Sequence, residues 1–201
     1  MKKNLFGFLS AMLMAFVCVS LTACGGDDGD GGGGVSGGTG SGSVGGNGIS
    51  FSYNRGYFYA QAGKNGKTDY IIMLYNCDYF TAIQRRDASM LPNELQSMTI
   101  TFPAEGSTSA VPTGEFTPFE ALTVSITKEQ LLAGEEHGKQ YGGGSSTAPV
   151  KITKNGDTYT ISFDEIDFVN VLNGNHSVVF SSGFTYTGTL APVPEGYFSV
   201  K

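Results

Sequence analysis

Three Asn-Gly pairs constrain the fold of this chain most strongly, because each lies between two strand-like runs of residues. They are Asn65-Gly66, Asn155-Gly156 and Asn173-Gly174. Asn-Gly at the centre of a two-residue loop favours a type I′ turn, which joins adjacent antiparallel strands. Each pair therefore predicts a β-hairpin, and its position predicts which residues face each other across the two strands.

The hairpin around Asn155-Gly156 has the simplest pattern. A two-residue loop would pair Ile152 with Tyr159 and Val150 with Ile161. One face is then apolar and the other consists of Lys, Thr and Ser, as in a strand pair that is buried on one side only. The apolar face comprises Val150, Ile152, Tyr159, Ile161 and Phe163.

The hairpin around Asn65-Gly66 is apolar on both faces. The same rule pairs Tyr59 with Ile72 and Tyr57 with Leu74, and it places Tyr57, Tyr59 and Tyr70 on one face. Exposed tyrosines offer flat rings with a polar tip, which suit contacts with sugars or with a protein partner. These three residues are the candidate ligand contacts, and burial in the core is the alternative.

The third hairpin and the last strand-like run complete the pattern. Asn173-Gly174 would pair Val169 with Val178 and Phe168 with Val179. In residues 184–190, threonines alternate with Phe184, Tyr186, Gly188 and Leu190. Further strands are expected at 98–102, 122–126 and 114–116, while 87–95 and 134–148 are expected to be long loops.

In total the sequence predicts an all-β domain of about nine strands, mostly in sequential hairpins. An antiparallel β-sandwich is the favoured architecture, and a calycin-like β-barrel is the alternative. One short helix is expected near 128–133, because Thr127 can act as its N-cap and Gly134 can end it.

The first residues have a different character. Lys2 and Lys3 precede an apolar run that extends to Leu21, which is typical of a secretory signal peptide over residues 1–23. An uncleaved transmembrane helix is the alternative. The run ends in Leu21-Thr22-Ala23-Cys24, which resembles the lipobox of bacterial lipoproteins.

The resemblance implies that a diacylglyceryl group is attached to the sulfur of Cys24 and that the chain is cut just before it. Two or three acyl chains hold a protein firmly on a membrane, whereas one chain gives marginal binding. The chain is therefore expected to be an outer-membrane lipoprotein. An ordinary signal peptide with a chance cysteine is the alternative.

Residues 24–48 are expected to form a flexible tether, because more than half of those after Cys24 are glycine. A single β domain is expected over 49–201. Asp27, Asp28 and Asp30 resemble the acidic export tract of Bacteroidota surface lipoproteins, which implies exposure on the cell exterior. A periplasmic-facing lipoprotein is the alternative.

The C-terminal part of the chain carries a weaker resemblance. The stretches KITKNGDTYTISFDEID and SSGFTYTGTL are similar to uncharacterised β-rich lipoproteins of Bacteroidota. This likeness implies a fold class and not an activity.

Charge and cysteine content exclude some partners. With 12 basic and 18 acidic residues, the chain lacks the clustered cations that a nucleic-acid surface requires. Cys18 would leave with the signal peptide and Cys24 would carry lipid. Cys77 would then have no intrachain disulfide partner, and we expect it to be a buried apolar residue.

No catalytic or metal motif stands out. His137 and His176 belong to no paired-histidine spacing, so neither a metal nor a cofactor is expected. Asp164, Glu165 and Asp167 form the densest acidic group, and two such carboxylates could hydrolyse a glycoside. The leading hypothesis is a non-enzymatic binding module for a glycan or a protein partner. A fimbrial or assembly subunit, a glycoside hydrolase and a small-ligand-binding barrel are the alternatives.

Overall fold

The computed structural model describes residues 36–63, 66–135, 138–145, 147–172, 177–194 and 197. The predicted signal peptide, the lipobox with Cys24, and Asp27, Asp28 and Asp30 lie outside the described residues. Asn65, the Asn173-Gly174 turn, His137 and His176 also lie outside them.

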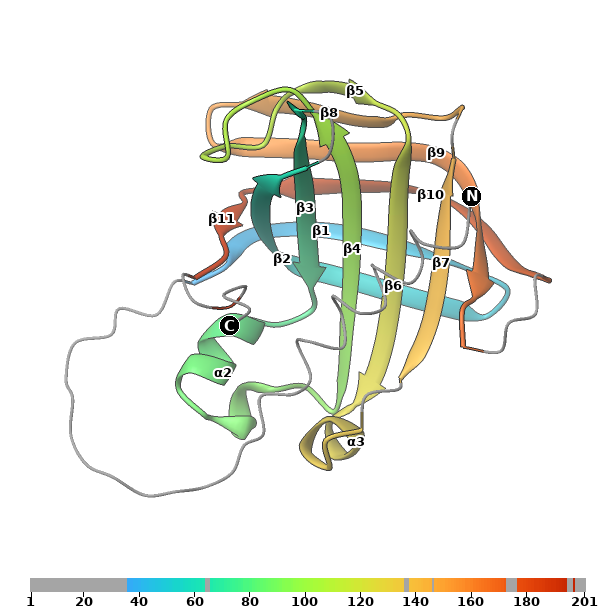
Figure 1. Cartoon of the computed structure of the whole chain (residues 1–201). Helices are drawn as coiled ribbons and strands as arrows, with labels where there is room; N and C mark the ends of the chain where they lie inside the picture. Colours follow the sequence, from blue (N-terminus) through green and yellow to red (C-terminus); the bar gives the residue numbers. More distant parts are fainter. Residues whose placement is uncertain are drawn as a thin grey trace.

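The described chain consists mainly of strands (Figure 1). The strands are β1 (Gly38–Gly46), β2 (Ile49–Ala62), β3 (Thr68–Tyr75), β4 (Glu94–Ala104), β5 (Gly114–Phe116), β6 (Phe119–Thr127), β7 (Lys139–Ser145), β8 (Val150–Asn155), β9 (Thr158–Asn170), β10 (Val178–Gly188) and β11 (Ala191–Pro192). The helices are α2 (Tyr79–Gln84) and α3 (Lys128–Leu132), and a 3₁₀ turn spans Ala88–Met90. None of the helices described is long and apolar enough to cross a membrane.

Eight strands close into an antiparallel barrel. The order runs β1-β2-β3-β4-β6-β7-β9-β10, and β10 pairs back onto β1. In Figure 1 the strands β3, β4, β6 and β7 stand side by side, while β1, β9 and β10 cross them. The all-β prediction is confirmed, and the barrel alternative describes the architecture better than the sandwich. The sandwich prediction is wrong because β10 pairs with both β1 and β9, so the sheet closes on itself.

Aromatic rings fill the barrel. Phe168 stacks on Phe180 with ring centroids 4.9 Å apart, and Phe163 lies 5.2 Å from Phe184. Tyr186 is fully buried among them. Aromatic residues on alternating positions of the strands therefore supply the main hydrophobic core.

A second apolar cluster lies outside the barrel, on the outer face of β2 and β3. Helix α2 places Phe80 against this face, where the Phe80 ring lies 4.7 Å from that of Tyr57. Near the C-terminus, the ring of Tyr197 packs on Phe80 at 4.8 Å. The sequence did not predict α2, because Tyr79–Gln84 continues an apolar run that reads as strand.

The tether prediction is wrong for its last part, since residues 38–46 form β1 between β2 and β10. Their glycines allow close backbone approach: a Cβ on Gly38 would lie only 2.2 Å from the carbonyl oxygen of Thr189. The predicted loop 134–148 likewise contains β7. A Cβ on Gly143 would lie 2.5 Å from the carbonyl oxygen of Asp167. Both stretches are strands, and at these two glycines the neighbouring backbone leaves no room for a side chain.

The predicted faces of the β8–β9 hairpin are confirmed, although its register is shifted by two residues. Ile152 pairs with Ile161 and Val150 pairs with Phe163. A shift of two keeps every side chain on its face, because side chains alternate with a period of two. All five residues of the predicted apolar face are buried.

The register predicted for β2 and β3 is wrong by one residue. Tyr57 pairs with Met73, and Tyr59 pairs with Ile71. The Gly63 N–H donates to the Lys67 carbonyl oxygen at 2.8 Å, so the loop holds three residues and not two. An odd loop length moves the residues of one strand to the opposite face.

The predictions for the remaining strands and for the helix agree more closely with the structure. Val169 pairs with Val178 as expected, but a shift in the strands then pairs Phe168 with Phe180. The three further strands are present as parts of β4, β6 and β5. Helix α3 begins with the predicted N-cap, Thr127.

Candidate functional site

The three tyrosines predicted to contact a ligand do not form a site. Tyr57 and Tyr70 are both fully buried, and they belong to different clusters on opposite faces of the sheet. Tyr59 is half-buried against the outer cluster. The one-residue register error had placed all three on a common face, so the prediction of an aromatic binding patch is wrong.

Tyr57 instead has a structural role where the described chain begins. Its hydroxyl donates to the Asp78 carboxylate at 2.5 Å, and Ser36 donates to the other oxygen of that group at 3.1 Å. Burial alone would raise the pKa of Asp78. Hydrogen bonds, led by that from Tyr57, outweigh burial and lower the pKa below its ordinary 3.8. Asp78 thus ties the chain before β1 to β2 and α2.

Cys77, next to Asp78, is a half-buried thiol that packs against the outer cluster. Burial and the neighbouring Asp78 carboxylate raise the pKa of Cys77 to about 12. The thiol is therefore protonated at neutral pH and is a poor nucleophile.

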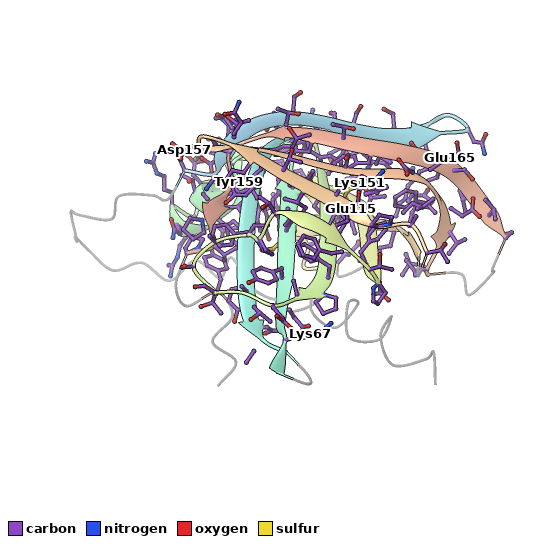
Figure 2. The ribbon with its side chains drawn as sticks, turned by 90° about the horizontal axis from the view of Figure 1, so that it is seen from above. Lys67, Glu115, Lys151, Asp157, Tyr159 and Glu165 are labelled. Atoms are coloured by element: carbon purple, nitrogen blue, oxygen red, sulfur yellow. The ribbon has the colours of Figure 1, made fainter. Side chains whose placement is uncertain are left out.

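The acidic group suggested for glycoside hydrolysis lies on the exposed outer side of β9. Asp164 forms an ion pair with Lys151 at 3.3 Å, and Asp167 accepts a hydrogen bond from Ser181. Figure 2 shows Lys151 on β8 and Glu165 on β9 at separate points along this layer. No group of three or more His, Cys, Asp or Glu side chains within the described ranges could hold a metal ion.

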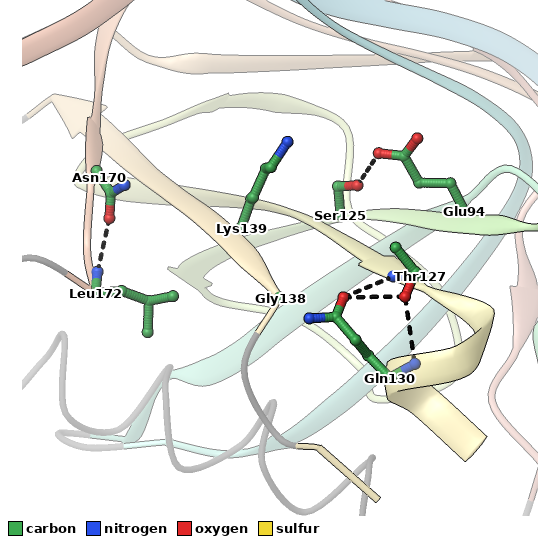
Figure 3. A pocket seen from close by; sticks show the side chains of 8 residues that line it. All are labelled: Glu94, Ser125, Thr127, Gln130, Gly138, Lys139, Asn170 and Leu172. Carbon is green, nitrogen blue, oxygen red and sulfur yellow. Dashed lines mark hydrogen bonds between the residues drawn. The ribbon is translucent and has the colours of Figure 1, made fainter. Parts of the chain in front are cut away.

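A cleft of about 350 Å³, lined mainly by residues with polar side chains, opens at one end of the barrel (Figure 3). We call it the mouth cleft. Strand β4 contributes Glu94, β6 contributes Ser125 and Thr127, and Gln130 comes from α3. The opposite side is formed by Gly138, Lys139, Asn170 and Leu172.

Strand alternation explains why these side chains meet. Ser125 lies two residues from Thr123, whose hydroxyl contacts that of Tyr53 inside the barrel. Lys139 lies two residues from Tyr141, which also belongs to the core. Residues two apart share a face of a strand, so the mouth cleft continues the interior face to the end of the barrel.

Hydrogen bonds fix part of the cleft wall. Ser125 donates to the Glu94 carboxylate, which holds this anion over β6. The side-chain oxygen of Gln130 accepts from the backbone N–H and the hydroxyl of Thr127, both at 3.1 Å. This capping box leaves the Gln130 amide nitrogen without a partner among the described residues, facing the cleft in Figure 3.

The two charges of the cleft are not paired with each other. The only ion pair within the described part of the chain joins Lys151 to Asp164, so Lys139 and Glu94 remain apart. Ser125 pairs in register with Lys139 of β7 and with Gln96 of β4, two residues from Glu94. The cleft thus presents a cation and an anion on the two strands that flank β6.

The cleft does not extend into the barrel. The hydroxyls of Tyr53 and Thr123 lie 2.5 Å apart and satisfy each other just inside the cleft. Phe51 and Phe180 pack on the ring of Tyr141, at 5.9 Å and 5.7 Å. A ligand in the cleft would therefore meet a wall that carries polar side chains and a closed aromatic floor.

The sequence did not indicate this site. Only Thr127 had been singled out, as a helix cap. Glu94 and Lys139 are isolated charges at strand ends, and they approach only through the pairing of β4, β6 and β7. The Thr127-x-x-Gln130 spacing was the one available local signal.

In comparisons with known proteins, no family model, no curated protein and no solved structure matches this chain.

Proposed function

We propose that this protein is a lipid-anchored, non-enzymatic binding module of the bacterial envelope, built on a calycin-like barrel that takes a small polar ligand in its mouth. The observation that carries the proposal is the mouth cleft, whose volume of about 350 Å³ falls in the range of small-molecule sites. Such sites are common at the mouths of β-barrels, where the scaffold fixes the side chains.

The charged and polar groups of the lining favour a small hydrophilic ligand. Glu94, Lys139 and the Gln130 amide offer an acceptor, a cation and a donor within one cleft. The tyrosines that could have stacked on a sugar are buried or half-buried, which favours hydrogen-bonded recognition over aromatic stacking.

The anchor part of the proposal rests on the sequence. Residues 1–23 would be removed as a signal peptide and Cys24 would carry acyl chains. Asp27, Asp28 and Asp30 support an orientation toward the cell exterior. Replacing Cys24 with serine should shift the protein out of the membrane fraction, and mass spectrometry of the mature wild type should find acyl chains on the Cys24 sulfur.

Binding is tested with the mature full chain in detergent micelles. Isothermal titration would use a panel of amino acids, dipeptides, monosaccharides and disaccharides. At least one class should bind, and Lys139→Met should weaken that binding. Lys154→Met is the matched control, because Lys154 lies over the Tyr159 ring of the β8–β9 hairpin and not in the cleft. Silence across the panel, or equal loss in both variants, would refute the proposed site.

A further inference from the structure

The opposite charges of the mouth cleft narrow the class of ligand. Most surface charges are solvated singly or paired with a neighbour, as Lys151 is with Asp164. Lys139 and Glu94 line the same cleft, yet no ion pair joins them among the described residues. Within the described residues, the cleft therefore presents one positive and one negative group that are both available to a ligand.

Their spacing follows from the strand register. Ser125 on β6 is in register with Lys139 on β7, so about 4.8 Å separates the two strands there. On the other side, the Glu94 carboxylate is held at the Ser125 hydroxyl. The anion thus sits over β6, about one strand spacing from the strand that carries the cation. Figure 3 shows both side chains reaching into the same space.

From this arrangement we propose that the ligand is a small zwitterion of the amino acid or dipeptide class; this inference rests on the proposed function of the mouth cleft. The α-ammonium group of the ligand binds the Glu94 carboxylate. Its carboxylate binds the Lys139 ammonium and the Gln130 amide nitrogen. Leu172, an exposed apolar residue on the opposite side, contacts an aliphatic side chain of the ligand.

The rest of the cleft agrees with a ligand of this size and polarity. Hydrogen bonds to charged groups are the strong ones, and two such contacts at opposite ends of a ligand fix its direction. A neutral sugar would leave both protein charges without a counterion. A purely anionic ligand would be repelled by Glu94, because like charges close together disfavour binding.

The test uses the mature full chain in detergent micelles and the dipeptide Ala-Leu as the probe. Isothermal titration compares Ala-Leu with N-acetyl-Ala-Leu, which lacks the cation, and with Ala-Leu amide, which lacks the anion. Each blocked form should bind the wild type at least about tenfold more weakly than Ala-Leu. These comparisons need no protein variant, so they do not depend on how a substitution affects folding.

Two variants then assign each end of the ligand. In Lys139→Met, Ala-Leu should lose its advantage over the amide but keep its advantage over the acetylated form. In Glu94→Gln, Ala-Leu should lose its advantage over the acetylated form but keep its advantage over the amide. Equal binding of the free and blocked dipeptides would overturn the zwitterion inference. It would also be overturned if Lys139→Met and Glu94→Gln changed the binding of the amide and of the acetylated form in the same way.

Titration with the whole ligand panel distinguishes failure of the zwitterion inference from failure of the proposed function. Sugar binding that Lys139→Met weakens, with no binding of Ala-Leu, would overturn the zwitterion and leave the mouth cleft as a binding site. No binding of any panel member would overturn both.

Discussion

The barrel interior and the mouth cleft lie on the same face of the same strands, yet their chemistry is opposite. Inside, Phe163, Phe168 and Phe184 pack ring against ring and are almost wholly buried. Glu94, at the start of β4, and Lys139, at the start of β7, are exposed to solvent. The change occurs at the layer where the Tyr53 and Thr123 hydroxyls meet.

This difference in chemistry implies that the interior stabilises the fold, whereas the mouth cleft serves ligand binding. Burying a large aromatic side chain removes apolar surface from water and stabilises the fold by several kcal/mol. Exposed charges at the mouth contribute little to stability, because water solvates them in the folded and unfolded states alike. We therefore expect substitutions in the interior to lower the free energy of unfolding and substitutions at the mouth to change mainly ligand binding.

The largest effect is expected from Phe168→Ala. Phe168 is fully buried and stacks on Phe180, so its removal leaves a cavity and should lower the free energy of unfolding by about 3–5 kcal/mol. Urea unfolding followed by circular dichroism measures this loss. Val178→Ala, at a side chain that is 57% exposed, is the control and should change stability little. Similar losses in both variants would contradict a packed interior.

Gly38→Ala should have the next largest effect. The new Cβ would lie 2.2 Å from the Thr189 carbonyl oxygen, and relieving such overpacking costs about 1–3 kcal/mol. Gly183→Ala is the matched control, because its nearest neighbour would be 3.5 Å away. Thermal unfolding of both variants tests whether the glycine-rich stretch belongs to the barrel. If Gly38→Ala left thermal stability unchanged, residues 38–46 would belong to the flexible tether and not to the barrel.

Asp78→Asn should have a smaller effect that depends on pH. The folded pKa of Asp78 is lowered, so the stability from its ionised form is fully present above pH 3.8 and is lost as pH falls through the folded pKa. The variant should be about 1 kcal/mol less stable at pH 7. The gap should close on acidification below pH 3.8, which unfolding titrations between pH 2 and pH 7 can follow. A gap that stays constant with pH would contradict this role.

The smallest effect on stability is expected from Lys139→Met. No ion pair of Lys139 appears among the described residues, so removing its charge should change the free energy of unfolding by less than about 0.5 kcal/mol. Differential scanning calorimetry measures this change. A large loss of stability would show that Lys139 supports the folded structure, which would contradict the distinction between a stabilising interior and a binding mouth.

Local sequence patterns predicted the strands well where one face is buried. The alternation from Val150 to Phe163 identified the core face correctly even with a shifted register. The same reasoning failed for Tyr57 and Tyr59, because both faces of that hairpin are apolar and nothing in the pattern penalises a one-residue slip. Closure of the barrel depends on β10 reaching β1, a contact between distant segments that no local pattern contains.

The other error of the sequence analysis was to predict glycine-rich strands as a tether and a loop. A glycine-rich stretch reads as a flexible linker from composition alone, but Gly38 and Gly143 lie in strands where neighbouring backbones approach closely. The candidate site was missed for a related reason. Glu94 and Lys139 belong to separate strands and become neighbours only when β4, β6 and β7 pair.

The central claim is that recognition occurs at the mouth, apart from the interior and the outer cluster. The most direct measurement is a titration of the ¹⁵N-labelled full chain in micelles with Ala-Leu, followed by the amide chemical shifts. We expect the changes to be confined to residues around Glu94, Ser125 and Lys139. Changes centred on α2 and Tyr75 instead would contradict the central claim, as would the absence of any change with Ala-Leu and with every other member of the ligand panel.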